Sequence, residues 1–398
     1  MDNQRVKFPE VLFFQEGPGV RNTQYTNEGV KLLNVANLVD GSIDLSTSDR
    51  YISTSEAFGK YKHFLCDEGD FIVASSGIKV EYIDKKMGFV TKEMLPLCMN
   101  TSTIRFKALD KNILNIRYFM YFLKSNDFKQ QLARHITGSA QLNYGPSHLK
   151  IMTMPLVSIE EQVAIVNKLD ITADLLQIRN KQLQKFDDLI KARFVEMFGD
   201  PISNPKKWKI VKIRDVVTDV RYGTSRPAVE GGKYPYLRMN NLTVDGQIDL
   251  NDLKYIDIPE SEIEKCIVRK GDVLFNRTNS IELVGKTALF NLPDEMVIAG
   301  YIIRLRLNKD LLPEILTQYM NLKPLKDILR SMAKGAVNQA NINAQELQSI
   351  NVYLPEMELQ NSFVEFAHQI DKSKVVYLKA ARKYHKQSKV VEMKMSQC

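Results

Sequence analysis

The sequence contains one long pattern twice, and this duplication limits the possible folds more than any other feature. Five segments of the first half return in the same order in the second half. The pairs are NVANLVDGSIDL around Asn37 and RMNNLTVDGQIDL around Asn241, EGDFIVASSG (68–77) and KGDVLFNRTN (270–279), TIRFKAL (103–109) and IIRLRLN (302–308), GSAQLN (138–143) and GAVNQAN (335–341), and IEEQ (159–162) and MELQ (357–360). A repeat of this length predicts a duplicated domain rather than the short unit of a solenoid.

Each half begins with a strand-rich part. Apolar runs of strand length, separated by Gly and Asp-Gly, occupy 30–39, 71–74, 234–239 and 297–307. One helix is expected in each half, and these helices are placed at 116–136 and 313–333. The pattern predicts an α+β fold with two similar strand-rich domains, at 1–155 and 200–355, joined by a linker at 198–210.

Each half ends in a long helix, expected at 156–199 and at 356–398. Both segments carry one apolar stripe, and Asn180 and Asp187 interrupt the first stripe at positions where a polar residue would fix the register. Since neither stripe is stable in water, we expect the two helices to pack together. About 40 residues span about 60 Å at about 1.5 Å per residue, so the pair would hold the two domains a fixed distance apart. Packing of each helix on its own domain is the alternative.

The charge balance favours a polyanionic partner. The chain has 55 Lys and Arg against 47 Asp and Glu, a formal net charge of +8, and basic side chains displace counterions from phosphates. A protein that is basic without binding nucleic acid is the alternative. The four cysteines form no C-x-x-C pair, and no apolar run approaches the roughly 18 residues of a membrane span. We therefore expect a cytoplasmic protein with no membrane contact.

No enzyme motif is present in the sequence. Phosphate-binding loops, zinc-protease motifs, nucleophile elbows and dinucleotide fingerprints are all missing. Acid-x-Lys triplets of the kind found in metal nucleases occur at Asp84–Lys86, Asp127–Lys129 and Asp252–Lys254. Such triplets arise by chance in any chain with many charged residues. We expect no catalytic residue, cofactor site or metal site. The alternative is a self-sufficient DNA nuclease or methyltransferase with an unrecognised site.

Polar and basic loops at matching places in the two halves supply the candidate DNA-binding residues. Arg, Asn and Gln bond base edges with paired hydrogen bonds, whereas Ser, Thr and Lys usually contact phosphates. The candidates in the first half are Arg21, Asn22, Gln24, Asn37, Ser75, Ser76, Lys79, Arg105, Ser139 and Gln141. The candidates in the second half are Arg221, Tyr222, Thr224, Ser225, Arg226, Arg238, Asn240, Asn276, Arg277, Thr278, Asn279, Lys334, Asn338 and Gln339. For any single residue, a structural turn or a solvated loop explains the sequence equally well.

Two strands carry charges at alternate positions. Arg304 and Arg306 share one face of the alternating segment at 303–307, and Arg105 and Lys107 repeat this arrangement in the first half. That face is either solvated or turned toward phosphates.

With these features assembled, the chain resembles the specificity subunits of Type I restriction-modification enzymes over essentially its whole length. The resemblance rests on the twofold repeat, the GDFIVASSG and GDVLFNRTN strands, the Gly-then-Gln/Asn segments before IEEQ and MELQ, and the helix that runs into RFVEMFGDP (193–201). It implies two target-recognition domains that each read half of a split, asymmetric DNA target. It also implies that the two long helices are spacers that pair as an antiparallel coiled coil.

The resemblance further implies partners. The spacers would dock two modification subunits that methylate adenine with S-adenosylmethionine, and a restriction subunit that uses ATP and Mg would join them. The first-half loops lack the RTN sequence of the second half. This difference fits halves that read different bases, and the base read by each residue does not carry over from the family.

Overall fold

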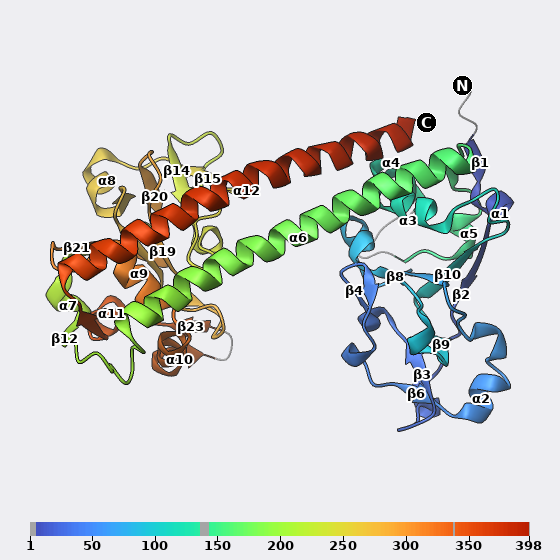
Figure 1. The fold of residues 1–398 in the computed structure, drawn as a ribbon, viewed down its shortest axis with the longest axis horizontal. Helices are drawn as coiled ribbons and strands as arrows, with labels where there is room; N and C mark the ends of the chain where they lie inside the picture. Colours follow the sequence, from blue (N-terminus) through green and yellow to red (C-terminus); the bar gives the residue numbers. More distant parts are fainter. Residues whose placement is uncertain (1–4, 136–142, 337–338, 398) are drawn as a thin grey trace. The chain divides into compact units, whose positions relative to one another are not determined.

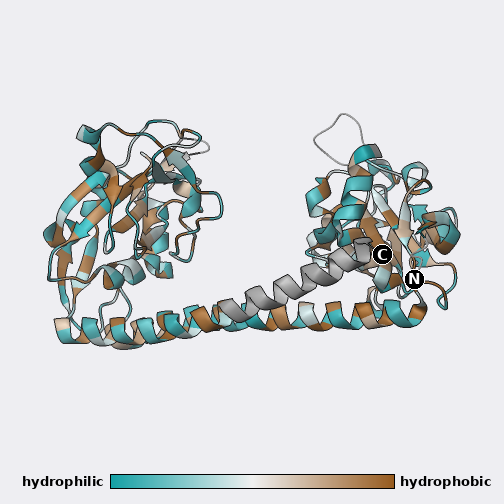
Figure 2. Cartoon of the chain, turned by 90° about the horizontal axis from the view of Figure 1, so that it is seen from above, coloured by the Kyte–Doolittle hydropathy of each residue, from teal (hydrophilic) through white to brown (hydrophobic). Residues whose placement is uncertain are grey.

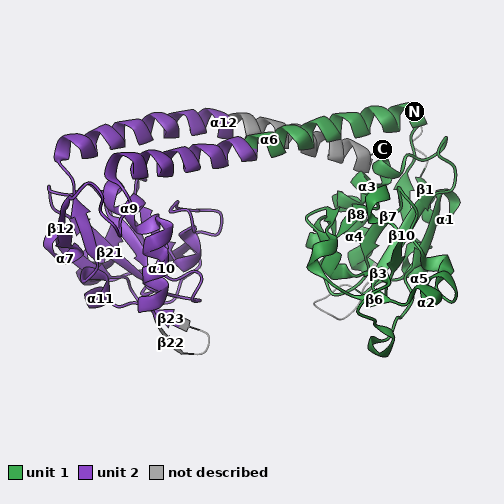
Figure 3. Cartoon of the chain, turned by 60° about the horizontal axis from the view of Figure 1, so that its bottom comes forward, with its two compact units in different colours: residues 1–179, 379–398 green, residues 180–378 purple. Residues whose placement is uncertain are grey.

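The computed structural model describes residues 5–135, 143–336 and 339–397 of the chain. It divides into two compact units, shown in different colours in Figure 3. Unit 1 comprises residues 1–179 and 379–398, and unit 2 comprises residues 180–378. Each unit holds one strand-rich part together with portions of both long helices (Figure 1).

The centre of unit 1 is a four-stranded antiparallel sheet in the order β2-β10-β7-β8. Its strands are β2 (Leu12–Glu16), β10 (Thr103–Ala108), β7 (Phe71–Ala74) and β8 (Met87–Phe89). Helix α3 (Ile116–Lys124) packs on this sheet through Phe119, whose ring centroid lies 5.0 Å from that of Phe106 and 6.3 Å from that of Phe71. The aromatic residues of the apolar runs therefore form the core of this unit.

The centre of unit 2 is a four-stranded sheet of equivalent strand order. Its order is β13-β21-β17-β19, again antiparallel throughout. The strands are β13 (Val217–Tyr222), β21 (Ile302–Leu307), β17 (Val273–Asn276) and β19 (Thr287–Leu289). Helix α9 (Pro313–Asn321) packs on β17 and β19 as α3 packs on the sheet of unit 1. The predicted duplication is confirmed at the level of strand order.

A second sheet accompanies the first in each unit, and each contains one parallel pair. Unit 1 has the order β6-β3-β9 with β3 and β9 parallel, and unit 2 has β15-β14-β20-β16 with β14 and β20 parallel. The strands are β3 (Val30–Leu33), β6 (Tyr51–Ile52), β9 (Leu97–Met99), β14 (Tyr234–Leu237), β15 (Lys254–Ile256), β16 (Ile267–Val268) and β20 (Met296–Ile298). The runs at 30–39 and 297–307 each contain parts of two strands rather than forming a single strand.

The remaining elements are short pairs of strands, short helices and the two long helices. The strands are β1 (Arg5–Lys7) with β11 (Thr153–Pro155), β4 (Leu38–Val39) with β5 (Ser42–Ile43), β12 (Lys209–Lys212) with β24 (Asn351–Leu354), and β18 (Thr278–Asn279) with β23 (Gln339–Asn341) and β22 (Lys334–Ala336). The helices are α1 (Phe8–Val11), α2 (Thr54–Phe58), α4 (Asn126–His135), α5 (Pro146–Leu149), α6 (Ile159–Phe198), α7 (Ile213–Val216), α8 (Glu260–Cys266), α10 (Lys323–Met332), α11 (Ala344–Gln348) and α12 (Met357–Gln397).

The single helices predicted at 116–136 and 313–333 are each two helices in the structure. In unit 1 the break is at Ser125, whose hydroxyl oxygen accepts a hydrogen bond from the backbone N–H of Phe128 at 3.3 Å. In unit 2 the break is at Leu322, two residues before Pro324. Proline lacks the N–H that a continuous helix needs, and its ring clashes with the carbonyl one turn earlier. The prediction missed both breaks.

The long helices α6 and α12 pack against each other within unit 2. Phe194 contacts Phe363, with ring centroids 5.1 Å apart, and Phe186 contacts Tyr377, with ring centroids 5.3 Å apart. As the residue number increases along α6, the number of the contacting residue on α12 decreases, so the two helices are antiparallel. Figure 2 shows hydrophobic and hydrophilic residues alternating along α6, as such a stripe requires. The prediction of paired helices is confirmed.

One polar position of the α6 stripe has a partner on α12. Asp187 accepts a hydrogen bond from Lys374, and the two side chains form an ion pair. A charge pair at a helix–helix seam favours one register over its alternatives. Asn180, the other polar position, is exposed.

The helices of the described residues fall short of a membrane span. None of the helices in that part joins the length to the apolar content that crossing a bilayer requires.

Candidate nucleic-acid interface

The polar loop after β17 is joined to the Gly-then-Gln/Asn segment that precedes α12. Strand β18 pairs with β23 so that Thr278 lies opposite Asn341, and the Thr278 hydroxyl donates to Asn341 Oδ1 at 2.9 Å. The backbone N–H of Ile342 donates to the carbonyl of Arg277 at 2.9 Å. Two segments that are more than 60 residues apart in the sequence are thereby joined in one small sheet, and we call this joined region the edge.

Unit 1 repeats this connection. Ser76 forms an isolated bridge with Asn143, and the backbone N–H of Tyr144 donates to the carbonyl of Ser75 at 3.0 Å. The Ser76 hydroxyl also donates to Ser102 Oγ at 2.6 Å. The match of Asn143 with Asn341 in the two segments therefore reflects a repeated backbone contact.

These segments also contain candidate residues of which little or nothing is described. Ser139, Gln141 and Asn338 lie outside the described residues. The backbones of Lys334 and Gln339 belong to β22 and β23.

The end of β13 approaches the same edge in unit 2. Gly223 lies so close to neighbouring backbone that a Cβ atom there would be 2.1 Å from the carbonyl oxygen of Ile298. Beyond it, the N–H of Thr224 donates to that carbonyl at 2.9 Å. Only glycine permits this approach, so the RYGTSR loop is fixed where it turns, and Ser225 after the turn is exposed.

Tyr222 connects this loop to the edge. The Tyr222 hydroxyl accepts a hydrogen bond from the backbone N–H of Ala344 at 2.8 Å, and the Arg277 guanidinium carbon lies 5.0 Å from the centroid of the Tyr222 ring. Arg277 itself is half-buried. We call Tyr222, Arg277, Thr278 and Asn341 the edge cluster of unit 2.

The other arginines among the unit 2 candidates are paired with carboxylates. Arg221 Nε donates to Asp219 at 2.8 Å. Arg226 binds Glu262 with two hydrogen bonds, at 2.7 and 3.2 Å. Arg238 donates to Asp252 Oδ2 at 2.6 Å and to the Asp252 carbonyl at 2.9 Å. Asp252 is therefore a partner of Arg238 and of Lys254, which lies 3.3 Å away, rather than one of a group of metal-binding acids.

In unit 1 three of the described candidate side chains, those of Arg21, Asn22 and Lys79, are exposed. Arg21 and Asn22 are exposed, while Gln24 donates to Glu56 Oε1 at 2.8 Å and to the Tyr61 hydroxyl at 3.1 Å. Lys79 is exposed and lines a pocket of about 360 Å³ together with Tyr82 and other residues. Asn240 of unit 2 is exposed as well.

Five candidates are buried, and for these the expectation of a DNA contact is corrected. Four of them have internal side-chain hydrogen bonds, while Ser75 Oγ has no hydrogen-bond partner among the described residues. Asn37 and Asn276 are fully buried, Ser75 and Thr278 are nearly so, and Arg105 is 6% exposed. Asn37 Nδ2 donates to the Asp44 carbonyl, and Asn276 Nδ2 donates to those of Thr278 and Tyr301. Such groups shape the loops, since a side chain without access to solvent cannot reach a base. The sequence could not separate them from less buried neighbours of the same type, such as Asn279, which is half-buried.

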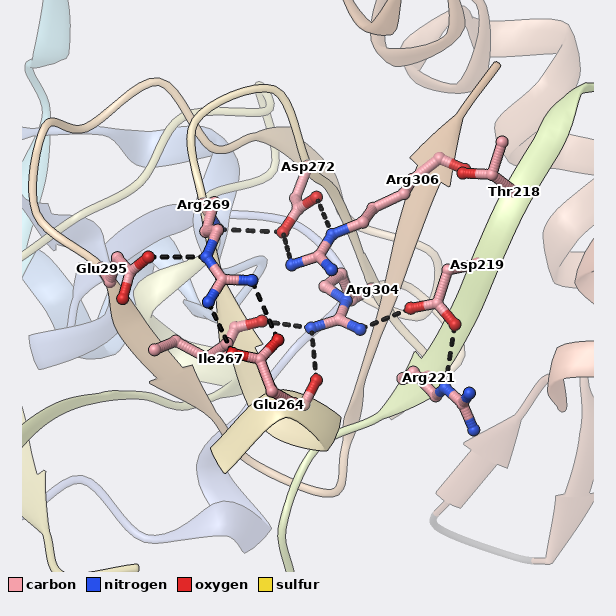
Figure 4. Close-up of polar contacts among 10 residues, drawn as sticks. All are labelled: Thr218, Asp219, Arg221, Glu264, Ile267, Arg269, Asp272, Glu295, Arg304 and Arg306. Atoms are coloured by element: carbon pink, nitrogen blue, oxygen red, sulfur yellow. Dashed lines mark hydrogen bonds and ion pairs between the residues drawn. The ribbon is translucent and has the colours of Figure 1, made fainter. Parts of the chain in front are cut away.

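The charged strand face is an internal ion network rather than a phosphate-facing surface. In unit 1, Arg105 pairs with Asp70 at 3.1 Å. Figure 4 shows the unit 2 counterpart, where Arg304 contacts Asp219 and the carbonyl of Ile267, and Arg306 pairs with Asp272 at 2.9 Å. Arg304 is 1% exposed. A buried charge needs such partners, because desolvation without them is costly.

Two functional side chains outside the candidate set position these loops. Lys286 is buried and donates to the carbonyl of Met239 at 2.7 Å, which holds the segment that carries Arg238 and Asn240. Lys326 on α10 donates to the carbonyl of Gly285 at 2.6 Å. Burial, with Arg330 and Lys286 nearby, lowers the pKa of Lys326 to about 7. The sequence could not have identified these two lysines, because nothing distinguishes them from the many other lysines of a basic chain.

The repeated IEEQ and MELQ segments also have a structural explanation. Gln162 and Gln360 are both fully buried. Gln360 Oε1 accepts a hydrogen bond from the N–H of Leu312 at 2.9 Å, and its amide donates to the carbonyls of Asp310 and Pro355. Gln162 makes the same three kinds of contact in unit 1. Each glutamine ties the start of a long helix to the loop before the domain helix.

Acidic, cysteine and histidine side chains are the usual protein ligands of metal ions. Within residues 5–135, 143–336 and 339–397, no group of three such side chains is placed to hold an ion. Burial raises the pKa of the Cys66 and Cys98 thiols to about 12.

The chain matches a known family model over most of its length. The model, described as the Type I restriction modification DNA specificity domain, matches twice, at residues 20–186 and 205–383. The Type I restriction enzyme EcoKI specificity subunit of Escherichia coli strain K12 is 24% identical over 269 residues, which cover 64% of this chain and 58% of that protein. The matched part thus spans little more than half of that relative.

Solved structures show the same fold. The S subunit of a Type I restriction-modification system from M. genitalium superposes with a TM-score of 0.51 at 16% identity, over 98% of this chain and 95% of that chain. A structure from work on complex assembly and conformational transition of the type I R-M system gives a TM-score of 0.56 at 17% identity, over 100% and 98% of the two chains.

Proposed function

The chain belongs to the Type I restriction modification DNA specificity family, and from this premise we propose that it is the non-catalytic subunit that reads a split, asymmetric DNA target. Residues 1–155 and 200–355 are the two target-recognition domains, and 156–199 and 356–398 are the spacer helices. The subunit needs no cofactor of its own and acts in the cytoplasm.

One observation carries this proposal: the same loop-to-edge connection occurs once in each unit, with different side chains on it. The connection itself is kept, since Thr278 and Asn341 in unit 2 correspond to Ser76 and Asn143 in unit 1. The side chains beside it differ, because Arg277 and Tyr222 in unit 2 correspond to Ser75 and Glu16 in unit 1. Sequence-specific recognition requires a fixed backbone that carries variable polar side chains. The backbone positions the side chains, and the contacts of those side chains with bases determine which sequence is bound. The net charge of +8 supports binding to phosphates.

The partners follow from the same proposal. The paired helices α6 and α12 dock two modification subunits, which methylate adenine with S-adenosylmethionine, and restriction subunits that use ATP and Mg complete the assembly. The EcoKI relative is itself named as a specificity subunit of a restriction enzyme. The exposed apolar residues of α6, among them Ile171, Ile178 and Leu189, are consistent with partner contacts.

Binding of target duplex by the complete assembly tests the function. The full chain, assembled with the modification subunits of its host, is mixed with its methylated target sequence and with a shuffled duplex of equal composition. We expect the target to bind at least about a thousandfold more tightly, and both affinities to fall as salt rises. Equal affinity for the two duplexes, or DNA cleavage or methylation by the chain alone, would contradict the proposal.

A further inference from the structure

Arg277 differs from the other candidate arginines of unit 2 in what holds its side chain. Arg221, Arg226 and Arg238 each donate to a carboxylate, so part of their hydrogen-bonding capacity is used within the protein. Among the described residues, Arg277 has no carboxylate partner, and its Nε atom is buried without a hydrogen bond. Its guanidinium lies instead 5.0 Å from the centroid of the Tyr222 ring.

Tyr222 is itself fixed at both ends. Its backbone pairs with Ile303 in the ladder between β13 and β21, and its hydroxyl accepts the N–H of Ala344 at 2.8 Å. Gly223 follows it in the close approach to Ile298 described above. The ring is therefore a rigid platform, and an aromatic face attracts a guanidinium without occupying its N–H donors.

The backbone of Arg277 is equally fixed. Its N–H donates to the carbonyl of Tyr301 at 2.9 Å, and its own carbonyl accepts from Ile342 at 2.9 Å. A preorganised guanidinium with unused donors is suited to bind two adjacent acceptors. In the major groove, guanine presents such a pair, O6 and N7.

Unit 1 has the same frame with different chemistry. The β2–β10 register places Glu16 opposite Ile104, as Tyr222 lies opposite Ile303, and Ser75 occupies the position of Arg277. Gly17 makes the same close backbone approach as Gly223, since a Cβ atom there would be 2.0 Å from the carbonyl oxygen of Asn100. A carboxylate and a hydroxyl at these places cannot supply the paired donors that guanine accepts.

We propose that Arg277 reads a guanine in the half-site contacted by unit 2, and that Tyr222 is a positioning residue that holds Arg277 in the reading geometry. This inference rests on the proposed function, because it names one base contact of that function. Tyr222 acts through Arg277 and makes no base contact of its own.

The experiment measures base discrimination rather than binding alone. The assembly with its modification subunits is titrated with the target duplex and with duplexes in which each guanine is replaced singly, its pair changed with it. For the unmodified chain, we expect one guanine in one half-site whose replacement weakens binding roughly 5- to 150-fold. Arg277→Ala is expected to abolish that discrimination and to leave every position of the other half-site unchanged.

The Tyr222 variants separate positioning from folding. Tyr222→Leu should reduce discrimination at the same guanine, and Tyr222→Phe should restore most of it because the ring remains. Tyr255→Leu is the matched control, since Tyr255 is a similarly exposed tyrosine in unit 2 and should leave discrimination intact. Thermal unfolding of each assembly establishes that the variants are folded, and Arg277→Lys provides a variant that keeps the charge and is expected to lose the discrimination.

Each contrary result has a separate meaning. If the unmodified assembly shows no sequence preference at all, the proposed function is wrong. If it has a preference that Arg277→Ala leaves intact or weakens equally at both half-sites, the guanine contact is wrong. If Tyr222→Leu retains the full discrimination, or Tyr222→Phe is as defective as Tyr222→Leu, the positioning role of the ring is wrong.

Discussion

At the scale of residues, several polar side chains that stand out in the sequence stabilise the fold of the domains. Asn37 and Asn241 recur at matched positions, and each accepts a backbone N–H and donates to a carbonyl within its own loop. Arg105 and Arg304 are buried in ion pairs. Residues repeated in both halves therefore maintain the shared fold. Residues at matched positions that differ, such as Glu16 and Tyr222, are candidates for the difference in function.

Gln360 offers a direct test of the frame. Gln360→Ala would remove the hydrogen-bond partner of the Leu312 N–H and of the Asp310 and Pro355 carbonyls. Each buried group left unpaired costs roughly 1–3 kcal/mol. We expect the free energy of unfolding of unit 2 to fall by at least about 2 kcal/mol, as measured by urea denaturation. Gln369→Ala, at an exposed position of the same helix, should change it by less than about 0.5 kcal/mol. Equal effects of the two substitutions would show that the contacts of Gln360 are unimportant.

Lys326 predicts a pH dependence of stability. Burial lowers its pKa in the folded chain to about 7 from the usual 10.5, so between these values the unfolded chain binds one proton more than the folded chain. The free energy of unfolding should therefore rise from about pH 7 toward pH 10, with a slope of at most about 1.4 kcal/mol per unit from this group.

Substitution at this position checks the assignment. Lys326→Met should flatten the rise, and only a smaller slope should remain from Lys286, whose pKa burial also lowers. Lys323→Met, on the exposed side of the same helix, should leave the rise unchanged. The measurement is denaturant unfolding at successive pH values, and an identical pH profile for Lys326→Met and the unmodified chain would contradict the account.

At the scale of elements, the sequence predicted periodic features well and interruptions poorly. The helices at 159–198 and 357–397 followed from long apolar stripes without helix breakers, and the strand at 71–74 from a buried run. The breaks at Ser125 and Leu322 were missed, because a single side-chain cap or one proline competes with an otherwise continuous helical pattern. Which loop residues are exposed depends on strand pairing between distant segments, and the sequence alone does not contain that information.

The spacer role of the long helices predicts a change of DNA spacing. Insertion of seven residues into α6 after Arg179, with seven more into α12 after Leu378, lengthens both helices by about 10 Å. The gap between the two half-sites should then grow by about three base pairs, at about 3.4 Å per base pair. Seven residues inserted in the exposed loop between Glu230 and Gly231 should leave the gap unchanged. Methylation of duplexes with graded gaps measures this, and an unaltered gap preference would contradict the spacer role.

At the scale of the whole molecule, a duplicated domain becomes useful when its copies differ. The two units share the strand order of the central sheet, the edge connection and the helix anchoring. Unit 2 nevertheless has Arg277 and Tyr222 where unit 1 has Ser75 and Glu16. A protein with this asymmetry is expected to read two unlike half-sites, and a symmetric target would not fit it.

The most direct test of this account is a genome-wide map of methylated adenines in cells that contain the chain and its modification subunits. We predict one motif made of two different short sequences separated by a fixed number of unspecified base pairs, absent when the chain is deleted. A contiguous or palindromic motif that depends on this chain, or a split motif that persists without it, would contradict the account.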